Sequence, residues 1–126
     1  MDIAIVGATG NVGRKTLEVL QQKNLNIDNL YLVASPNSAG KQLEFNGKKY
    51  SIENLENYDF SKAKITFFAA GGKISEQYAE KAAKHTTVID NSSYFRMDPD
   101  VPLIVPQVNA KDIQNMKKNI IANPNC

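Results

Sequence analysis

The sequence has little cysteine, little net charge and no long apolar run, and each shortage excludes a class of protein. Its single cysteine, Cys126, excludes an internal disulfide framework and a cysteine-rich zinc cluster, and we expect no metal site. The 15 Lys and Arg residues against 13 Asp and Glu residues leave a net charge of +2, which is too small to indicate a nucleic-acid or membrane partner. No apolar run approaches the roughly 18 residues of a transmembrane helix. Met1-Asp2 leads straight into apolar residues without the features of a signal peptide, so we expect a cytoplasmic protein.

What remains is the composition of a chain that can fold as one domain. Of its 126 residues, 42% are apolar and 22% are charged, and a domain of this size can bury roughly two thirds of its unfolded surface. Short apolar runs alternate with stretches of helical periodicity. These runs predict strands at Ile3–Val6, Leu30–Ala34, Lys64–Ala69, Thr87–Asp90, Leu103–Val105 and Asn119–Ala122. Within Gln42–Ile52, the pair Asn46-Gly47 indicates the turn of a hairpin between two further short strands.

Helices are predicted between these strands. One covers Asn11–Lys23, and another covers Ile74–Lys84. The buried faces predicted from the periodicity are Val12, Thr16, Val19 and Leu20 for the first helix and Ile74, Tyr78, Ala82 and Ala83 for the second. Asn109 is suited to cap a third helix that extends to Met116. The alternation predicts an α/β fold over residues 1–126, with a Rossmann-like, doubly wound and mostly parallel sheet.

In such a sheet, ligands bind beyond the carboxyl ends of the strands. The segments to search are therefore Gly7–Gly13, Ser35–Lys41, Ala70–Lys73, Asn91–Arg96 and Asn123–Cys126. The first of these has the spacing G-x-x-G-x-x-G between a predicted strand and a predicted helix. Gly7 permits a tight turn, Gly10 lets a pyrophosphate approach the backbone, and Gly13 lets the helix pack closely on the strand. This context indicates a dinucleotide site, and the alternative is a glycine-rich turn without a ligand.

The loop after the second predicted strand bears on the choice of cofactor. A carboxylate there favours NAD and an arginine suits the 2′-phosphate of NADP, but Ser35–Lys41 contains neither. Ser35, Asn37 and Ser38 can donate hydrogen bonds to a phosphate, whereas Lys41 is more simply interpreted as a solvated charge.

Cys126 follows the last predicted strand, on the ligand side of the sheet. There it can be a nucleophile activated by a following helix, or a small buried apolar side chain, and position alone does not decide between them. His85 lies at a predicted helix end, and Glu76, Glu80 and Lys84 form one helix face. We interpret these four residues as solvated surface.

Six segments together resemble the N-terminal part of the aspartate-β-semialdehyde dehydrogenases, in the same order and spacing along the whole chain. They are Val6–Gly13, Ala34-Ser35 with Ser38–Lys41, Ala70-Gly71, Asp90–Arg96, Val105–Asn109 and Asn123–Cys126. The resemblance implies an NADP-dependent oxidoreductase that reduces L-aspartyl-4-phosphate to L-aspartate 4-semialdehyde. This reaction belongs to the biosynthesis of lysine, diaminopimelate, threonine and methionine.

The resemblance also implies roles for individual residues. Cys126 would attack the acyl phosphate and carry a thioester, which hydride from NADPH then cleaves. Arg96 would hold the phosphoryl group with its guanidinium fork, and Asn125 would assist the oxyanion. The cofactor-binding residues that motif and resemblance indicate together are Gly7, Thr9, Gly10, Asn11, Val12, Gly13, Ser35, Asn37, Ser38 and Gly71.

The chain departs from the family pattern in two ways. Asn37 stands where the family usually carries an arginine that contacts the 2′-phosphate, so we expect NAD to be tolerated beside NADP. The family chain also continues past Cys126 into a catalytic and dimerisation domain with a catalytic histidine. We therefore expect the 126 residues alone to be inactive, and the full-length protein to be a homodimer or a dimer of dimers that takes a small-molecule substrate and phosphate. Two alternatives stay open: an N-acetyl-γ-glutamyl-phosphate reductase, and a nucleotide-binding module without catalysis.

Overall fold

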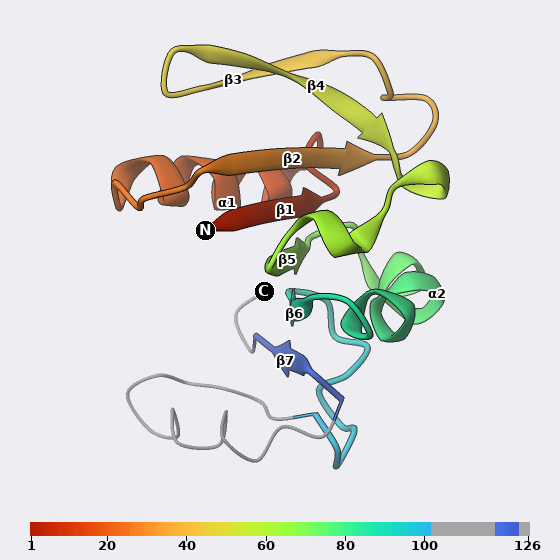
Figure 1. Cartoon of the computed structure of the whole chain (residues 1–126). Coiled ribbons are helices and arrows are strands. Elements are labelled where there is room, and N and C mark those ends of the chain that lie inside the picture. Colours follow the sequence, from red (N-terminus) through yellow and green to blue (C-terminus); the bar gives the residue numbers. More distant parts are fainter. Residues whose placement is uncertain (102–117, 124–126) are drawn as a thin grey trace.

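The computed structural model describes residues 1–101 and 118–123, and these form one open α/β sheet with helices on both sides (Figure 1). In chain order the elements are β1 (Asp2–Val6), α1 (Asn11–Gln22), β2 (Asn29–Ala34), β3 (Gln42–Phe45), β4 (Lys48–Asn54), the 3₁₀ turns η1 (Leu55–Asn57) and η2 (Phe60–Lys62), β5 (Ile65–Phe68), α2 (Gly72–Ala83), β6 (Thr87–Asp90) and β7 (Ile120–Ala122).

The sheet has the strand order β3-β4-β2-β1-β5-β6-β7. Every neighbouring pair is parallel except the hairpin of β3 and β4, whose turn residues Asn46 and Gly47 both have positive φ. This confirms the predicted doubly wound, mostly parallel sheet and its Asn-Gly hairpin. The chain leaves β1 toward β2 on one side and later returns to β5 on the other. The carboxyl ends of β1 and β5 therefore mark the topological switch point, where such folds bind ligands.

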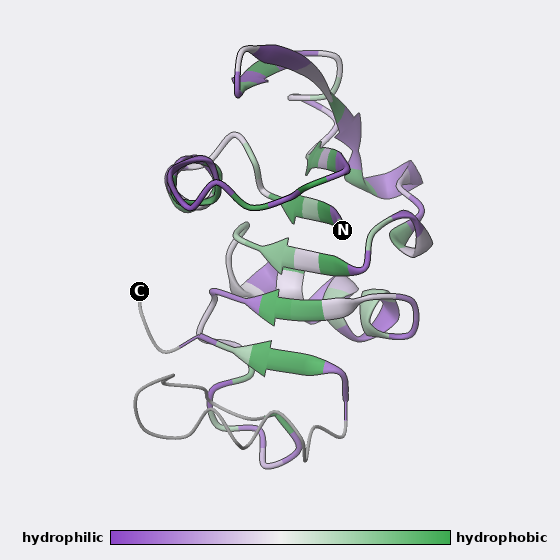
Figure 2. Cartoon of the chain, turned by 60° about the vertical axis from the view of Figure 1, so that its left-hand side comes forward, coloured by the Kyte–Doolittle hydropathy of each residue, from purple (hydrophilic) through white to green (hydrophobic). Residues whose placement is uncertain are grey.

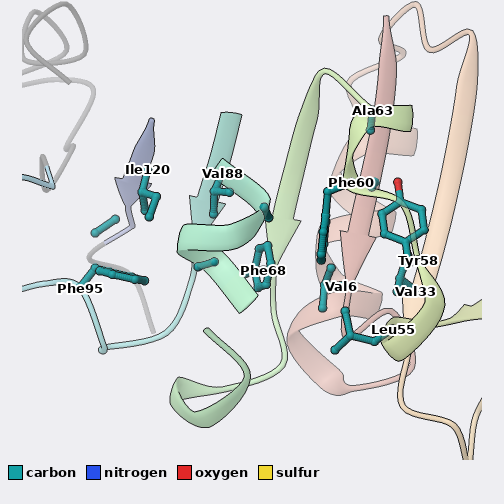
Figure 3. Close-up of a cluster of buried hydrophobic side chains, with 14 of the residues drawn as sticks. Val6, Val33, Leu55, Tyr58, Phe60, Ala63, Phe68, Val88, Phe95 and Ile120 are labelled. Atoms are coloured by element: carbon teal, nitrogen blue, oxygen red, sulfur yellow. The ribbon is translucent and has the colours of Figure 1, made fainter. Parts of the chain in front are cut away.

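Successive side chains of the central strands point to opposite faces of the sheet, which divides the core into two layers. In β1, Ile3 and Ile5 face the cluster that contains Leu17 and Leu20 of α1, whereas Ala4 and Val6 face the cluster that contains residues of α2. Figure 2 shows the two helices on opposite sides of the apolar strands. The layer on the α2 side is rich in aromatic rings, and Phe60 stacks on Phe68 with 6.1 Å between ring centroids (Figure 3).

The predicted buried face of α1 is correct for Leu20 and wrong for Val12 and Val19, while Thr16 is partly buried. The structure buries Gly13, Leu17 and Leu20, while Val12 is 46% and Val19 is 38% exposed. The reason lies at Gly13, where a Cβ atom would overlap the carbonyl group of Gly7. This close approach of helix and turn fixes the rotation of α1 about its axis, so that Gly13, Leu17 and Leu20 pack against the sheet.

Val12 and Val19 instead line a cavity of about 660 Å³ between α1 and the neighbouring strand β5, together with the partly buried Phe67.

The second helix matches its prediction more closely. It begins two residues earlier than predicted, at Gly72, and its fully buried residues are Ser75, Ala79 and Ala82. Ile74, Tyr78 and Ala83 of the predicted face pack against the same core while partly buried. The two 3₁₀ turns were not predicted, and each is capped by the carboxylate or amide oxygen of the residue before it. The strand at Leu103–Val105 and the helix at Asn109–Met116 lie outside the described residues.

None of the helices in residues 1–101 and 118–123 is long and apolar enough to cross a membrane.

Substitution of Gly13 tests the close packing of α1 on the turn. We expect Gly13→Ala to lower the free energy of unfolding by about 1–3 kcal/mol, because the added methyl group overlaps backbone that cannot move without displacing the turn. Gly72→Ala is the matched control, since a Cβ at Gly72 meets no atom within 4 Å. Urea unfolding of both variants measures the difference. Equal stability of the two variants would contradict this packing.

Candidate functional site

The glycine turn lies between β1 and α1, as its sequence predicts. Gly7 has a φ of +88°, and a Cβ there would lie 2.8 Å from the backbone of Ala69 and Ala70, so the turn packs directly against the segment after β5. A Cβ at Gly10 would meet only the Gly7 carbonyl oxygen, at 3.6 Å, which leaves that backbone open to approach. Gly10 is the N-cap of α1 and provides no side-chain cap, so the first amides of the helix face the ligand side uncapped.

A cavity of about 340 Å³ opens at this turn. It brings together Gly7, Thr9, Gly10 and Ser35 of the predicted cofactor site, and its other lining residues are Val6, Ala34, Leu55, Ala69, Ala70 and Ile74. Thr9 Oγ1 lies 3.4 Å from Ser38 Oγ, which links the turn to the loop after β2. Asn37 is exposed in that loop and does not line the cavity. The cavity therefore joins the ends of β1, β2 and β5 at the switch point.

A second cavity of about 300 Å³ adjoins the first, because Ala69 lines both. It is enclosed by the first residues of both helices and the loop after β6: Val12, Ala69, Gly71, Gly72, Asn91, Ser92, Ser93 and Arg96. Gly71, the N-cap of α2, has a φ of +90° and no capping side chain. The remaining predicted cofactor residues are divided. Val12 and Gly71 line this cavity, Asn11 lines the hollow beside Phe67, and Gly13 is buried under the turn.

Arg96 carries the strongest sign of a missing partner. Its Nε and Nη2 atoms are buried, and neither has a hydrogen-bond partner. A buried donor without an acceptor is costly, and a guanidinium group is matched best by two oxygens of a carboxylate or phosphate. Its neighbour Phe95 is 1% exposed and anchors the loop in the core (Figure 3). The position and donors of Arg96 thus fit an anion that enters the second cavity.

Sequence reasoning missed the group that supports this loop. Asp90, the last residue of β6, is fully buried and accepts hydrogen bonds from Ser75 Oγ at 2.7 Å, Ser92 N at 3.0 Å and Ser92 Oγ at 2.8 Å. The available signal was a carboxylate at the end of an otherwise apolar strand, followed by two serines.

The strand that leads to Cys126 runs beside the same loop. Asn123 donates its backbone N–H to the carbonyl of Asp90 at 2.9 Å, and its Nδ2 to Asn91 Oδ1 at 2.8 Å. Asn125 and Cys126 themselves lie outside the described residues, so their predicted roles stay predictions. Farther along the loop, the hydrogen bond from Lys118 holds the pKa of Asp98 below its usual value, and hydrogen bonds to Asp98 and Glu80 raise the pKa of Lys118.

Other charged residues agree with their interpretation as surface. Glu76 and Glu80 are exposed on α2, Lys84 is exposed at its C-cap, and His85 is exposed just beyond. Among the described residues, no three His, Cys, Asp or Glu side chains are grouped so that they could hold a metal ion.

Comparison with known proteins extends the argument beyond geometry. The family model for semialdehyde dehydrogenase, NAD binding domain, matches residues 2–116. Aspartate-semialdehyde dehydrogenase of Aquifex aeolicus is 54% identical over 128 residues, which covers 98% of this chain and 37% of the Aquifex protein. The crystal structure of aspartate semialdehyde dehydrogenase II from Vibrio cholerae has a TM-score of 0.94 and 49% identity, covering 99% of this chain and 38% of that chain.

A second Vibrio cholerae structure, of aspartate semialdehyde dehydrogenase II complexed with ASA, has a TM-score of 0.93 and 48% identity, covering 99% of this chain and 42% of that chain. The chain thus spans less than half the length of these relatives. Because the family model extends over nearly the whole chain, and the sheet has the order of a doubly wound nucleotide-binding fold, the chain belongs to the semialdehyde dehydrogenase NAD-binding domain family.

Proposed function

We propose that the chain is the nucleotide-binding part of a longer, phosphorylating aspartate-semialdehyde dehydrogenase. The observation that carries the proposal is that Arg96 has two buried donors, Nε and Nη2, without a hydrogen-bond partner in a cavity that adjoins the glycine turn. One cavity suits a dinucleotide and the other an acyl phosphate, and the reaction needs both beside each other. The names of the Aquifex and Vibrio relatives support the same reading.

The glycine turn fits the nicotinamide dinucleotide. The pyrophosphate would lie on the amides of Asn11, Val12 and Gly13 at the start of α1, where the helix dipole favours an anion and Gly10 leaves the backbone open. The adenosine side would run toward Ser35, which lines the cavity, and Ser38, whose hydroxyl contacts that of Thr9 in the turn. The nicotinamide would then point along Ala69–Gly71 toward the second cavity. We propose NADP as the cofactor, with NAD tolerated because Asn37 brings no charge to a 2′-phosphate.

The second cavity fits the phosphoryl group of the substrate. Arg96 would donate Nε–H and Nη2–H to two phosphate oxygens, and Ser92 and Ser93 line the same space. The uncapped start of α2 at Gly71-Gly72 adds backbone donors of the same polarity. The substrate's carbonyl carbon would then lie between Arg96 and Asn123, which follows β7.

In the proposed mechanism, Cys126 is the nucleophile. Its thiolate attacks, the C–O bond to phosphate breaks, and inorganic phosphate leaves with the electron pair while a thioester forms. A nicotinamide cofactor held on the glycine turn at Gly7, Gly10 and Gly13 would supply the hydride that reduces the thioester. The C–S bond then breaks, and Cys126 recovers its thiolate as L-aspartate 4-semialdehyde is released. Arg96 would stabilise the charge on the departing phosphate.

The partners we propose are a small-molecule substrate and phosphate, with a homodimer or dimer of dimers for the complete enzyme. Its product would serve the synthesis of lysine, diaminopimelate, threonine and methionine.

Activity of the complete protein tests the proposal. We expect it to reduce NADP⁺ with L-aspartate 4-semialdehyde only when phosphate is present, and Cys126→Ala to abolish this reaction. The semialdehyde of N-acetylglutamate is the matched alternative substrate. Turnover of that compound alone, or of neither, would overturn the proposed function.

Substitution of Arg96 tests its role in binding phosphate. We expect Arg96→Lys to raise the KM for phosphate by about tenfold to a hundredfold, because a lysine cannot reproduce two charged hydrogen bonds. Arg14→Lys is the control, since Arg14 is exposed on α1 and outside the second cavity. An unchanged KM for phosphate in the Arg96 variant would show that Arg96 does not bind the phosphate.

Substitution of Asn37 tests the origin of cofactor choice. Because a charged hydrogen bond to the 2′-phosphate contributes about 1.5–3 kcal/mol, we expect Asn37→Arg to shift the ratio of kcat/KM for NADPH over NADH about tenfold to a hundredfold toward NADPH. Asn26→Arg is the control, because it places the same charge on an exposed residue before β2, whereas Asn37 follows the other end of that strand. If both variants give the same ratio as the original chain, Asn37 does not set the preference.

A further inference from the structure

The carboxylate of Asp90 joins two walls of the second cavity. Ser75, which donates to Oδ1, lies in the first turn of α2, whose start at Gly71-Gly72 forms one wall. Ser92, which donates to both carboxylate oxygens, begins the loop that forms the opposite wall. Asp90 itself is not among the residues that line the cavity. A fully buried carboxylate with three short donors has a single low-energy position, so both walls are fixed to one point.

The chain of hydrogen bonds continues from Asp90 toward Arg96. Ser92 Oγ, which donates to Asp90, also accepts from the backbone N–H of Tyr94 at 3.2 Å. The backbone N–H of Arg96 then donates to the carbonyl of Ser93 at 3.3 Å and closes a turn. The loop is thus fixed at Ser92 by the carboxylate and at Phe95 by the core, with the guanidinium just beyond these two anchors.

We propose that Asp90 is a positioning residue for phosphate recognition: through Ser75 and Ser92 it sets the separation between the start of α2 and Arg96. The inference rests on the proposed function and deepens it. Neither Asp90 nor Ser75 lines the cavity, so both act on the phosphate only through the placement of Arg96 and of the α2 amides. Bidentate recognition depends on geometry, and a small displacement weakens it while leaving the nucleotide turn untouched.

The central experiment compares Ser75→Ala with a matched loss of a buried hydroxyl elsewhere. Thr66 and Thr86 share a buried hydrogen bond of 3.0 Å in the same sheet, and neither lines the second cavity. We expect Ser75→Ala in the complete enzyme to raise the KM for phosphate roughly tenfold while the KM for NADP⁺ changes less than about twofold. Thr66→Val should change neither constant, although it also removes a buried hydrogen bond.

A second variant addresses the carboxylate itself. Asp90→Asn preserves shape and some of the hydrogen bonds, and we expect a smaller rise in the KM for phosphate of the same selective kind. Equal effects of Ser75→Ala and Thr66→Val on both constants would overturn the inference, because they indicate stability alone. A phosphate KM that rises in Arg96→Lys but not in Ser75→Ala or Asp90→Asn would also overturn it and leave the proposed function standing. An unsubstituted enzyme without phosphate-dependent activity would overturn both.

Discussion

The contact of the glycine turn with its surroundings is the constraint on which the rest of the structure depends. A Cβ at Gly13 would lie 2.0 Å from the carbonyl oxygen of Gly7, and a Cβ at Gly7 would lie 2.8 Å from the backbone of Ala69 and Ala70, so neither position has room for a side chain. The first contact sets the rotation of α1 on the sheet, and the second holds the ends of β1 and β5 together at the switch point. The amides of α1 and the cavity at the turn have their positions because these backbones touch.

Asp90 likewise holds neighbouring segments together at the second cavity, but it does so by hydrogen bonding instead of close packing. The glycine contacts bring one strand end and one helix together, whereas the carboxylate brings α2 and the loop after β6 together. The result is two adjoining cavities, one at the backbone of the glycine turn and the other at two buried donor atoms of Arg96. The proposed reaction needs this pairing, since the nucleotide and the phosphoryl group of the substrate are both anionic and must be held at separate places.

The features that sequence predicted well are those set by local patterns. The Asn46-Gly47 hairpin and the glycine turn lie where predicted, because turn residues and apolar runs act over a few neighbouring positions. Of the predicted buried face of α1, Leu20 is buried, but Val12 and Val19 are exposed because the contact of Gly13 with the turn fixes the rotation of the helix. The hydrogen bonds of Asp90 were missed because one of its partners, Ser75, lies in another element, 15 residues away in the sequence. A side-chain hydrogen bond between residues so far apart in the sequence produces no periodic pattern of apolar residues.

A structure of the complete protein with NADP⁺ and inorganic phosphate bound tests most directly whether the two cavities act together. We expect the pyrophosphate on the amides at the start of α1, and the phosphate on Nε and Nη2 of Arg96 beside Ser92. The nicotinamide ring should lie along Ala69–Gly71, between the two anions. A phosphate bound away from Arg96, or an Arg96 guanidinium paired with a carboxylate of the protein itself, would contradict this arrangement.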